Sequence, residues 1–316
     1  MSTAALSAPK LLMVSKGPTY GANANPVAAN AMRCYNTSVT AMTAEVLPIT
    51  QDDGFSGGEI NAPATAQYAS ALTTTTHLYG GGTAGSASPQ DLLFRACGFN
   101  VTTVTGASVT YAPADLSSSL EWVDWNFNHS GQKRTAAGAR GTFSTTLEAG
   151  QLGRCEWSLA GLYTRPTDQA MPVPVYSGAI NPRPVNSTNT GTVTLGSFAA
   201  CLNTFTYTQG NEYSVFNQSS CTPVVRIASS KPEASLTIMR PALSAFNPYQ
   251  MIEESTVFAL TVGHGVTAGN IITASLPKVS IITCEDADVG GLAAYNLTLS
   301  VQRDAGATNY VSFAFT

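Results

Sequence analysis

The chain has 316 residues, of which 44% are hydrophobic and only 11% are charged, and its formal net charge is −4. This hydrophobic content supports folded cores and excludes a disordered chain, and the lack of a basic run argues against a surface that grips nucleic acid. With so few charges, uncharged polar residues must cover the surface, which suits proteins that bury their faces against copies of themselves and also suits secreted β proteins.

The N-terminal region does not read as a targeting segment. Residues 1–17 lack a charged start, and their apolar run covers only residues 11–14, so we expect no signal peptide. The most apolar long window, residues 256–276, is interrupted by Thr, Gly, Asn and His264. We therefore expect no membrane span.

A glycine-rich stretch follows at residues 51–59. Gly-Phe-Ser-Gly-Gly at residues 54–58 matches the G-x-S-x-G motif of hydrolases, which works only on a sharp turn between a strand and a helix. No helical pattern follows Glu59. The sequence therefore predicts a flexible loop here, and a secreted β-rich hydrolase that uses Ser56 is one alternative.

Two short helices are predicted. Residues 89–97 begin with Pro89 and are followed by Gly98, which are typical start and stop signals. A second helix is expected over residues 248–254, after Asn247.

Period-two alternation of bulky and small or polar residues dominates elsewhere and predicts half-buried antiparallel strands. The clearest stretches are residues 141–147, 155–161, 279–283, 297–301 and 310–315. Residues 120–129 change phase near Val123 and Asp124, which predicts a β-bulge or a strand that is buried on both faces.

Five prolines between residues 166 and 184 predict an extended connection between two domains, residues 1–174 and residues 175–316. The second domain is interpreted as a weak, divergent duplication of the first. Three pairs of stretches suggest it: residues 127–131 with 205–210, 141–147 with 233–238, and 150–162 with 269–281.

No constellation for catalysis emerges from the titratable residues. Six widely spaced cysteines form no zinc pattern and are expected to be buried free thiols, and His77, His129 and His264 are too scattered to ligate a metal. The acidic residues near position 286 lack the spacing of a calcium loop. We therefore expect no enzyme activity, no cofactor and no metal.

Motifs spread in order over nearly the whole chain resemble those of siphophage major tail tube proteins. The resemblance rests on residues 10–21, 25–30, 92–99, 109–113, 138–143, 159–163, 210–212, 231–235, 264–271 and 274–278. Residues 218–221 depart from the usual pattern of the family.

The resemblance implies a mainly β fold: two β-sandwich or rolled-sheet domains, each with one short helix, that assemble into stacked rings. Three copies would form a pseudo-hexameric ring, with a true hexamer as the alternative. Stacking would use an N-terminal arm, residues 1–35, and a loop. The loop residues are Gln51, Asp52, Asp53, Gly54, Phe55, Ser56, Gly57, Gly58 and Glu59. The lumen-facing acidic residues are predicted to be Asp124, Glu148 and Glu156.

The same resemblance implies a structural protein of the virion tail, assembled in the host bacterial cytoplasm. Its partners would be further copies of itself, the tape measure protein, the tail terminator and the distal tail proteins, and phage DNA would pass through the lumen without specific binding. Alternatives are another ring-forming tail component, such as a terminator or decoration protein, and a carbohydrate-binding β module that uses Trp122 and Trp125.

Overall fold

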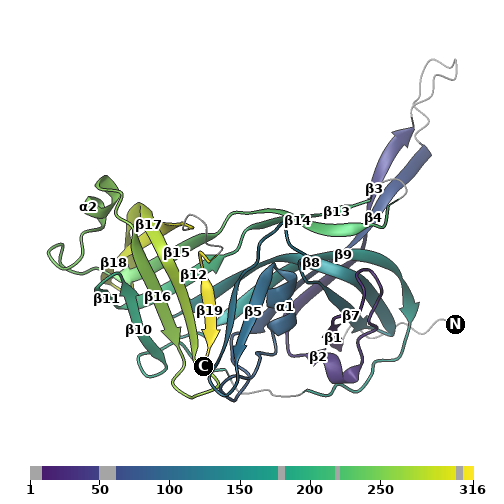
Figure 1. The fold of residues 1–316 in the computed structure, drawn as a ribbon, viewed down its shortest axis with the longest axis horizontal. Helices are drawn as coiled ribbons and strands as arrows, with labels where there is room; N and C mark the ends of the chain where they lie inside the picture. The colour runs from purple at the N-terminus through teal and green to yellow at the C-terminus, as the bar shows by residue number, and fades with distance from the viewer. Residues whose placement is uncertain (1–8, 50–61, 177–181, 218–220, 304–308) are drawn as a thin grey trace.

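The computed structural model describes residues 9–49, 62–176, 182–217, 221–303 and 309–316, and the fold is mainly β, as predicted (Figure 1). The strands of the first half are β1 (Lys10–Ser15), β2 (Ala31–Met32), β3 (Tyr35–Ile49), β4 (Ala62–His77), β5 (Phe99–Val104), β6 (Ser108–Pro113), β7 (Val123–His129), β8 (Gln132–Glu148) and β9 (Arg154–Asp168). Those of the second half are β10 (Thr190–Leu195), β11 (Phe198–Ala200), β12 (Leu202–Thr208), β13 (Asn211–Phe216), β14 (Val224–Ser230), β15 (Glu233–Met239), β16 (Phe258–His264), β17 (Ile272–Val289), β18 (Leu292–Val301) and β19 (Ser312–Phe315).

Both predicted helices are confirmed as α1 (Asp91–Ala96) and α2 (Pro248–Glu253), and a 3-10 turn, η1, covers Ala28–Asn30. Gly98 follows α1 with φ +83°, a left-handed conformation that glycine adopts without strain. The side chain of Asn247 caps α2 by accepting from the backbone nitrogen of Gln250 at 3.2 Å.

Eight long or central strands form one continuous antiparallel run in the order β3, β4, β9, β8, β12, β15, β18, β17. The first four strands come from the first half of the chain and the last four from the second. At the junction, Thr146 of β8 lies opposite Thr206 of β12. A second junction pairs β6 with β19. The two halves therefore share one sheet, which rolls around a common core.

The core is aromatic and lies between the two junctions. The ring of Phe94 on α1 is 5.0 Å from Trp157 and 5.2 Å from Phe143, both on strands of the first half, when centroids are compared. The same ring is 5.8 Å from Phe313 and 6.1 Å from Phe315, on the last strand of the chain. One buried phenylalanine therefore connects the packing of both halves.

Strand β7 combines both features that the phase change predicted. Its register with β8 shifts between Val123 and Trp125, and its first six residues are buried. Apolar and polar residues alternate along β7, and both sets are buried, so the strand is covered on both faces.

The proline-rich connection is shorter than predicted. Pro166 lies within β9, where a register shift opposite Lys133 and Thr135 accommodates a residue that cannot donate to the ladder. Residues 169–176 have neither helix nor strand. A boundary near residue 174 stays a prediction.

The cysteines are free, but the prediction that all are buried is wrong. Cys97 and Cys155 are buried, whereas Cys201 and Cys221 are exposed, because neither of the latter two lies on the core side of a paired strand. Among the described residues, no helix is both long enough and apolar enough to cross a membrane.

Candidate assembly surfaces

One face of the eight-strand run points away from the aromatic core and carries mostly short polar side chains. We call it the polar face. It consists of Tyr35, Ser38, Thr73, Thr75, His77, Thr142, Ser144, Thr146, Glu148, Arg154, Glu156, Ser158, Thr204, Thr206, Thr208, Glu233, Ser235, Thr237, Ser280, Thr283, Glu285, Asn296, Thr298 and Ser300. These residues alternate along each strand with buried neighbours such as Phe143, Trp157, Phe205, Leu236 and Leu297.

The registers align the polar face in rows that cross the boundary between the halves. In one row, Glu156 lies opposite Ser144, Ser144 opposite Thr208, Thr208 opposite Glu233 and Glu233 opposite Ser300. The part of the face around Ser158 on β9 is covered by β13, because the hydroxyl of Tyr213 contacts that of Ser158 at 2.8 Å. The remaining rows form a hydroxyl-rich surface over both halves.

The polar face is weakly acidic. Glu148 and Glu156, two of the residues predicted to face a lumen, lie on it, and their side chains are 43% and 57% exposed. Arg154 lies between them, with nitrogens 3.5 Å from Glu148 and 3.3 Å from Glu156. Among the residues of the polar face, four are glutamates and Arg154 is the one lysine or arginine.

The prediction that Asp124 faces a lumen is wrong, because this carboxyl group is fully buried. Its oxygens accept hydrogen bonds from the backbone nitrogens of Ala24 at 2.8 Å and Gly138 at 2.7 Å. Burial raises the pKa of Asp124, and the hydrogen bonds to the backbone oppose that shift. The segment that contains Ala24 covers the face of β7 that an isolated sheet would leave open.

The predicted stacking loop, Gln51 to Glu59, lies outside the described residues, and so does the candidate nucleophile Ser56. The strands that lead into it are described: β3 and β4 project from the body as a two-stranded ribbon (Figure 1). Of the predicted N-terminal arm, residues 9–35 are described and include β1, η1 and β2.

Strand β3 is a sheet edge. Its ladder partner is β4, and Asn36, Ser38, Thr40 and Met42 are exposed on it. Over residues 35–49 the strand carries one charged residue, Glu45. The carbonyl oxygens of Thr37 and Val39 accept from the side chains of Lys10 and Arg134, and beyond these positions a long, nearly uncharged edge strand can pair with another chain.

The other end of the eight-strand run is also an edge. Beyond Val279, β17 pairs with β18 and has no further ladder on its outer side among the described residues. This distal half carries the exposed residues Ile282, Glu285, Asp286 and Asp288. In Figure 1 the two hairpins that end the run, β3–β4 and β17–β18, lie at opposite ends of the molecule.

The two halves share one pairing scheme. In the first, β2 pairs with β1, β1 with β7, β7 with β8, β8 with β9, β9 with β4 and β4 with β3. The second half pairs its strands in the same succession: β11 with β10, β10 with β16, β16 with β17, β17 with β18, β18 with β15 and β15 with β12. By position in this succession, β17 corresponds to β8, and β12 corresponds to β3. Helix α1 follows β4 as α2 follows β15.

Local details repeat as well. The β7–β8 register shifts between Val123 and Trp125, and the β16–β17 register shifts between Phe258 and Leu260, two residues into each strand. Both strands are seven residues long and end on a histidine. The stretches that suggested a duplication in the sequence fall on strands that do not correspond. For example, residues 141–147 were matched with residues 233–238, but the first stretch lies on β8 and the second on β15, whereas the counterpart of β8 in the pairing scheme is β17.

The tryptophans do not form an exposed platform. Trp125 and Trp157 are buried, and half-buried Trp122 packs edge-on against Tyr20 with centroids 5.3 Å apart. Since a sugar platform needs an open aromatic face, these three residues give no support to a carbohydrate site.

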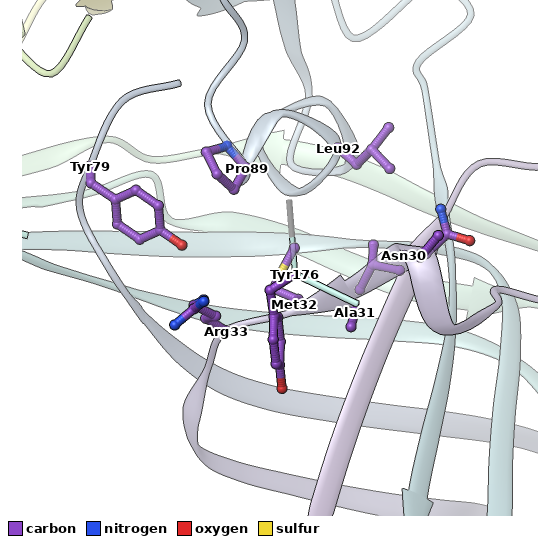
Figure 2. A pocket seen from close by; sticks show the side chains of 10 residues that line it. Asn30, Ala31, Met32, Arg33, Tyr79, Pro89, Leu92 and Tyr176 are labelled. Carbon is purple, nitrogen blue, oxygen red and sulfur yellow. The ribbon is translucent and has the colours of Figure 1, made fainter. Parts of the chain in front are cut away.

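A small cavity of about 140 Å³ lies between the N-terminal segment and α1 (Figure 2). Tyr79, Pro89 and Leu92 line one side, and the guanidinium carbon of Arg33 lies 4.7 Å from the ring centroid of Tyr176 on the other. Among its lining residues Arg33 is the one charged side chain, so the cavity holds no acid–base pair or activated nucleophile.

No group of three or more His, Cys, Asp or Glu side chains is placed to hold a metal within the described ranges. His264 is buried, which lowers its pKa, and its Nε2 lies 3.2 Å from the carbonyl oxygen of Arg183.

No protein-family model matches the chain, and no curated protein matches it either.

Proposed function

We propose that this chain is the major tail tube subunit of a long-tailed bacteriophage, a structural protein that polymerises into stacked rings around the path of DNA ejection. The ordered motifs given above motivate the family. The observation that carries the proposal is the eight-strand sheet, which has a polar face over both halves and, at each end, a strand edge without a further ladder partner among the described residues.

Open edges favour polymerisation. Two different edges, β3 and the distal half of β17, give a head-to-tail contact between copies, and such a contact closes into a ring when the rotation per copy divides a full turn. Ring closure would cover edges that otherwise invite uncontrolled pairing.

The repeated pairing scheme supports two related tail-tube domains per chain, residues 1–174 and 175–316, each with one short helix. Six such domains per ring require three copies, so we propose a trimeric ring with pseudo-sixfold symmetry. A hexameric ring is the alternative. Stacking along the tube would involve the N-terminal arm and the loop from Gln51 to Glu59.

The chemistry of the polar face suits a DNA channel. Its serine and threonine side chains are short and uncharged, and Glu148 and Glu156 flank the single arginine. A mildly acidic surface repels phosphates, and the two aromatic rings on this face, Tyr35 and His77, stack on each other with centroids 4.6 Å apart. DNA would therefore pass along it without being held.

In this role the protein belongs to the virion tail and assembles in the host cytoplasm, and its further partners would be the tape measure, tail terminator and distal tail proteins. It needs no cofactor and performs no catalysis.

Electron microscopy of the purified protein tests the proposal. We expect hollow tubes of stacked rings, and class averages of the end views count the subunits. Isolated rings that never elongate would instead favour a terminator or a decoration protein. Monomers with esterase turnover that Ser56→Ala abolishes would favour the hydrolase.

A further inference from the structure

We infer that the outer edge of β3 in one copy pairs, antiparallel, with the distal half of β17 in the next copy, with Ser38 opposite Ala287. This inference rests on the proposed function, because it specifies the lateral contact of the ring. The template for it lies inside the chain itself.

The template is the β8–β12 junction, where the two halves meet. Thr146 lies opposite Thr206, flanked by the pairs Thr145–Tyr207 and Leu147–Phe205. In the shared pairing scheme β17 corresponds to β8, and β3 corresponds to β12. A contact between β17 and β3 would therefore repeat, between two copies, the contact that already joins the two halves.

The register on β17 follows from its ladder with β18. The first residues of β7 and β16 lie opposite Ala139 and Val279, and two residues later come Gly141 and Ile281, which are therefore equivalent. Gly141 lies opposite Leu159 and Ile281 opposite Leu299, so these two leucines are equivalent as well. Five residues before these leucines, Arg154 lies opposite Thr146, and Ala294 lies opposite Ala287. Ala287 is therefore the counterpart of Thr146.

The register on β3 follows in the same way. Leu159 lies opposite Leu72, and Leu299 lies opposite Ala234, so Leu72 and Ala234 are equivalent. Their partners on the next strand are Val39 and Tyr207. The neighbouring residue Ser38 therefore corresponds to Thr206, and the pair Thr206–Thr146 becomes Ser38–Ala287.

The charges at the two edges are complementary. Lys10 and Arg134 reach β3, where their side chains donate to the carbonyl oxygens of Thr37 at 3.5 Å and Val39 at 3.2 Å. The distal half of β17 carries three exposed carboxylates, at positions 285, 286 and 288. Pairing with β17 requires the side chains of Lys10 and Arg134 to release these carbonyl oxygens, and the carboxylates of the approaching edge offer them new partners, which contacts between two β3 edges or two β17 edges would not do.

Disulfide trapping tests the register. In a background that carries Cys201→Ser and Cys221→Ser, the double variant Ser38→Cys with Ala287→Cys is assembled, oxidised mildly and run on a non-reducing gel. We expect a ladder of covalent oligomers that ends at the number of copies per ring. Residues opposite each other on paired strands have Cβ atoms close enough for a disulfide. Ser38→Cys combined with Asp286→Cys, or with Asp288→Cys, therefore tests whether the register is shifted by one residue in either direction.

The matched control pairs Ser38→Cys with Thr237→Cys, which lies on the polar face but in the interior of the sheet, and we expect no ladder from it. Tubes that form without a ladder at 286, 287 or 288 would overturn the β3–β17 pairing and leave the tube proposal intact. A protein that gives neither tubes nor rings nor a ladder would overturn both.

Discussion

The hydroxyl of Tyr20 lies 2.6 Å from the backbone nitrogen of Val225, a residue 205 positions later in the chain. The same hydroxyl lies 3.0 Å from the carbonyl oxygen of Gly138, to which it donates. Arg140 stacks on the tyrosine ring at 5.0 Å and donates to the carbonyl oxygen of Val225 at 2.7 Å. These contacts hold the β13–β14 hairpin, which belongs to the second half, against β8 of the first.

Replacing Tyr20 with phenylalanine should destabilise the fold. The change leaves the buried Val225 nitrogen without its acceptor, and an unsatisfied buried donor costs about 1–3 kcal/mol. Urea denaturation would measure the loss as a lower midpoint with an unchanged slope. Tyr68→Phe is the matched control, since Tyr68 is 45% exposed, and its midpoint should not change; equal effects of both variants would contradict the role of Tyr20.

Asp124 should make stability depend on pH with a defined sign. Burial raises its pKa above the ordinary value of 3.8, so the folded chain binds this proton more tightly than the unfolded chain does. The favourable contribution is then complete below pH 3.8 and is lost as pH rises through the raised pKa. Relative to Asp124→Asn, the native protein should therefore lose stability as pH increases above about 4.

Urea midpoints of both proteins at several pH values between 4 and 7 check this prediction, because the titration of every other group cancels in the difference. If the advantage of the native protein grew with pH instead, the hydrogen bonds from Ala24 and Gly138 would outweigh burial.

The shared core should couple the unfolding of the two halves. Phe94 contacts rings from both, so Phe94→Leu should lower the stability of both together, by about 1–3 kcal/mol for a partly filled cavity. Near-ultraviolet and far-ultraviolet circular dichroism should follow one transition in the native protein and the variant. Two separated transitions, of which one keeps its native midpoint, would show that the halves are independent.

Reversing charge on the polar face should create DNA retention. The double variant Glu148→Lys with Glu156→Lys leaves two glutamates against three lysine or arginine side chains there, while the loss of two half-exposed ion pairs costs little stability. More short DNA should cosediment with tubes of the variant than with native tubes. Added salt should reduce the amount that cosediments. The matched control is Glu253→Lys with Glu254→Lys, outside the polar face, and DNA uptake equal to that of this control would contradict the lumen assignment.

Local sequence signals were sufficient to predict the two helices and the clearest strands. The start and stop residues around α1 and α2 act within one helical turn, and the alternation at residues 155–161 reflects one face packed on a core, so both can be read from neighbouring residues. The assignment of Glu148 and Glu156 to the open face followed from the same alternation. It failed at Asp124, because a segment a hundred residues earlier covers β7 and no local pattern records that cover.

Sequence by itself determined that this is a mainly β, weakly charged chain with two short helices and hydroxyl-rich strand faces, since composition and periodicity depend on each residue's own chemistry. Only the tertiary structure decided which strands pair. It joined β8 to β12 in a single sheet, and it revealed a repeated scheme in which β17 is the counterpart of β8. Backbone hydrogen bonds between strands distant in sequence carry no residue code, so pairing becomes visible only when the chain has folded.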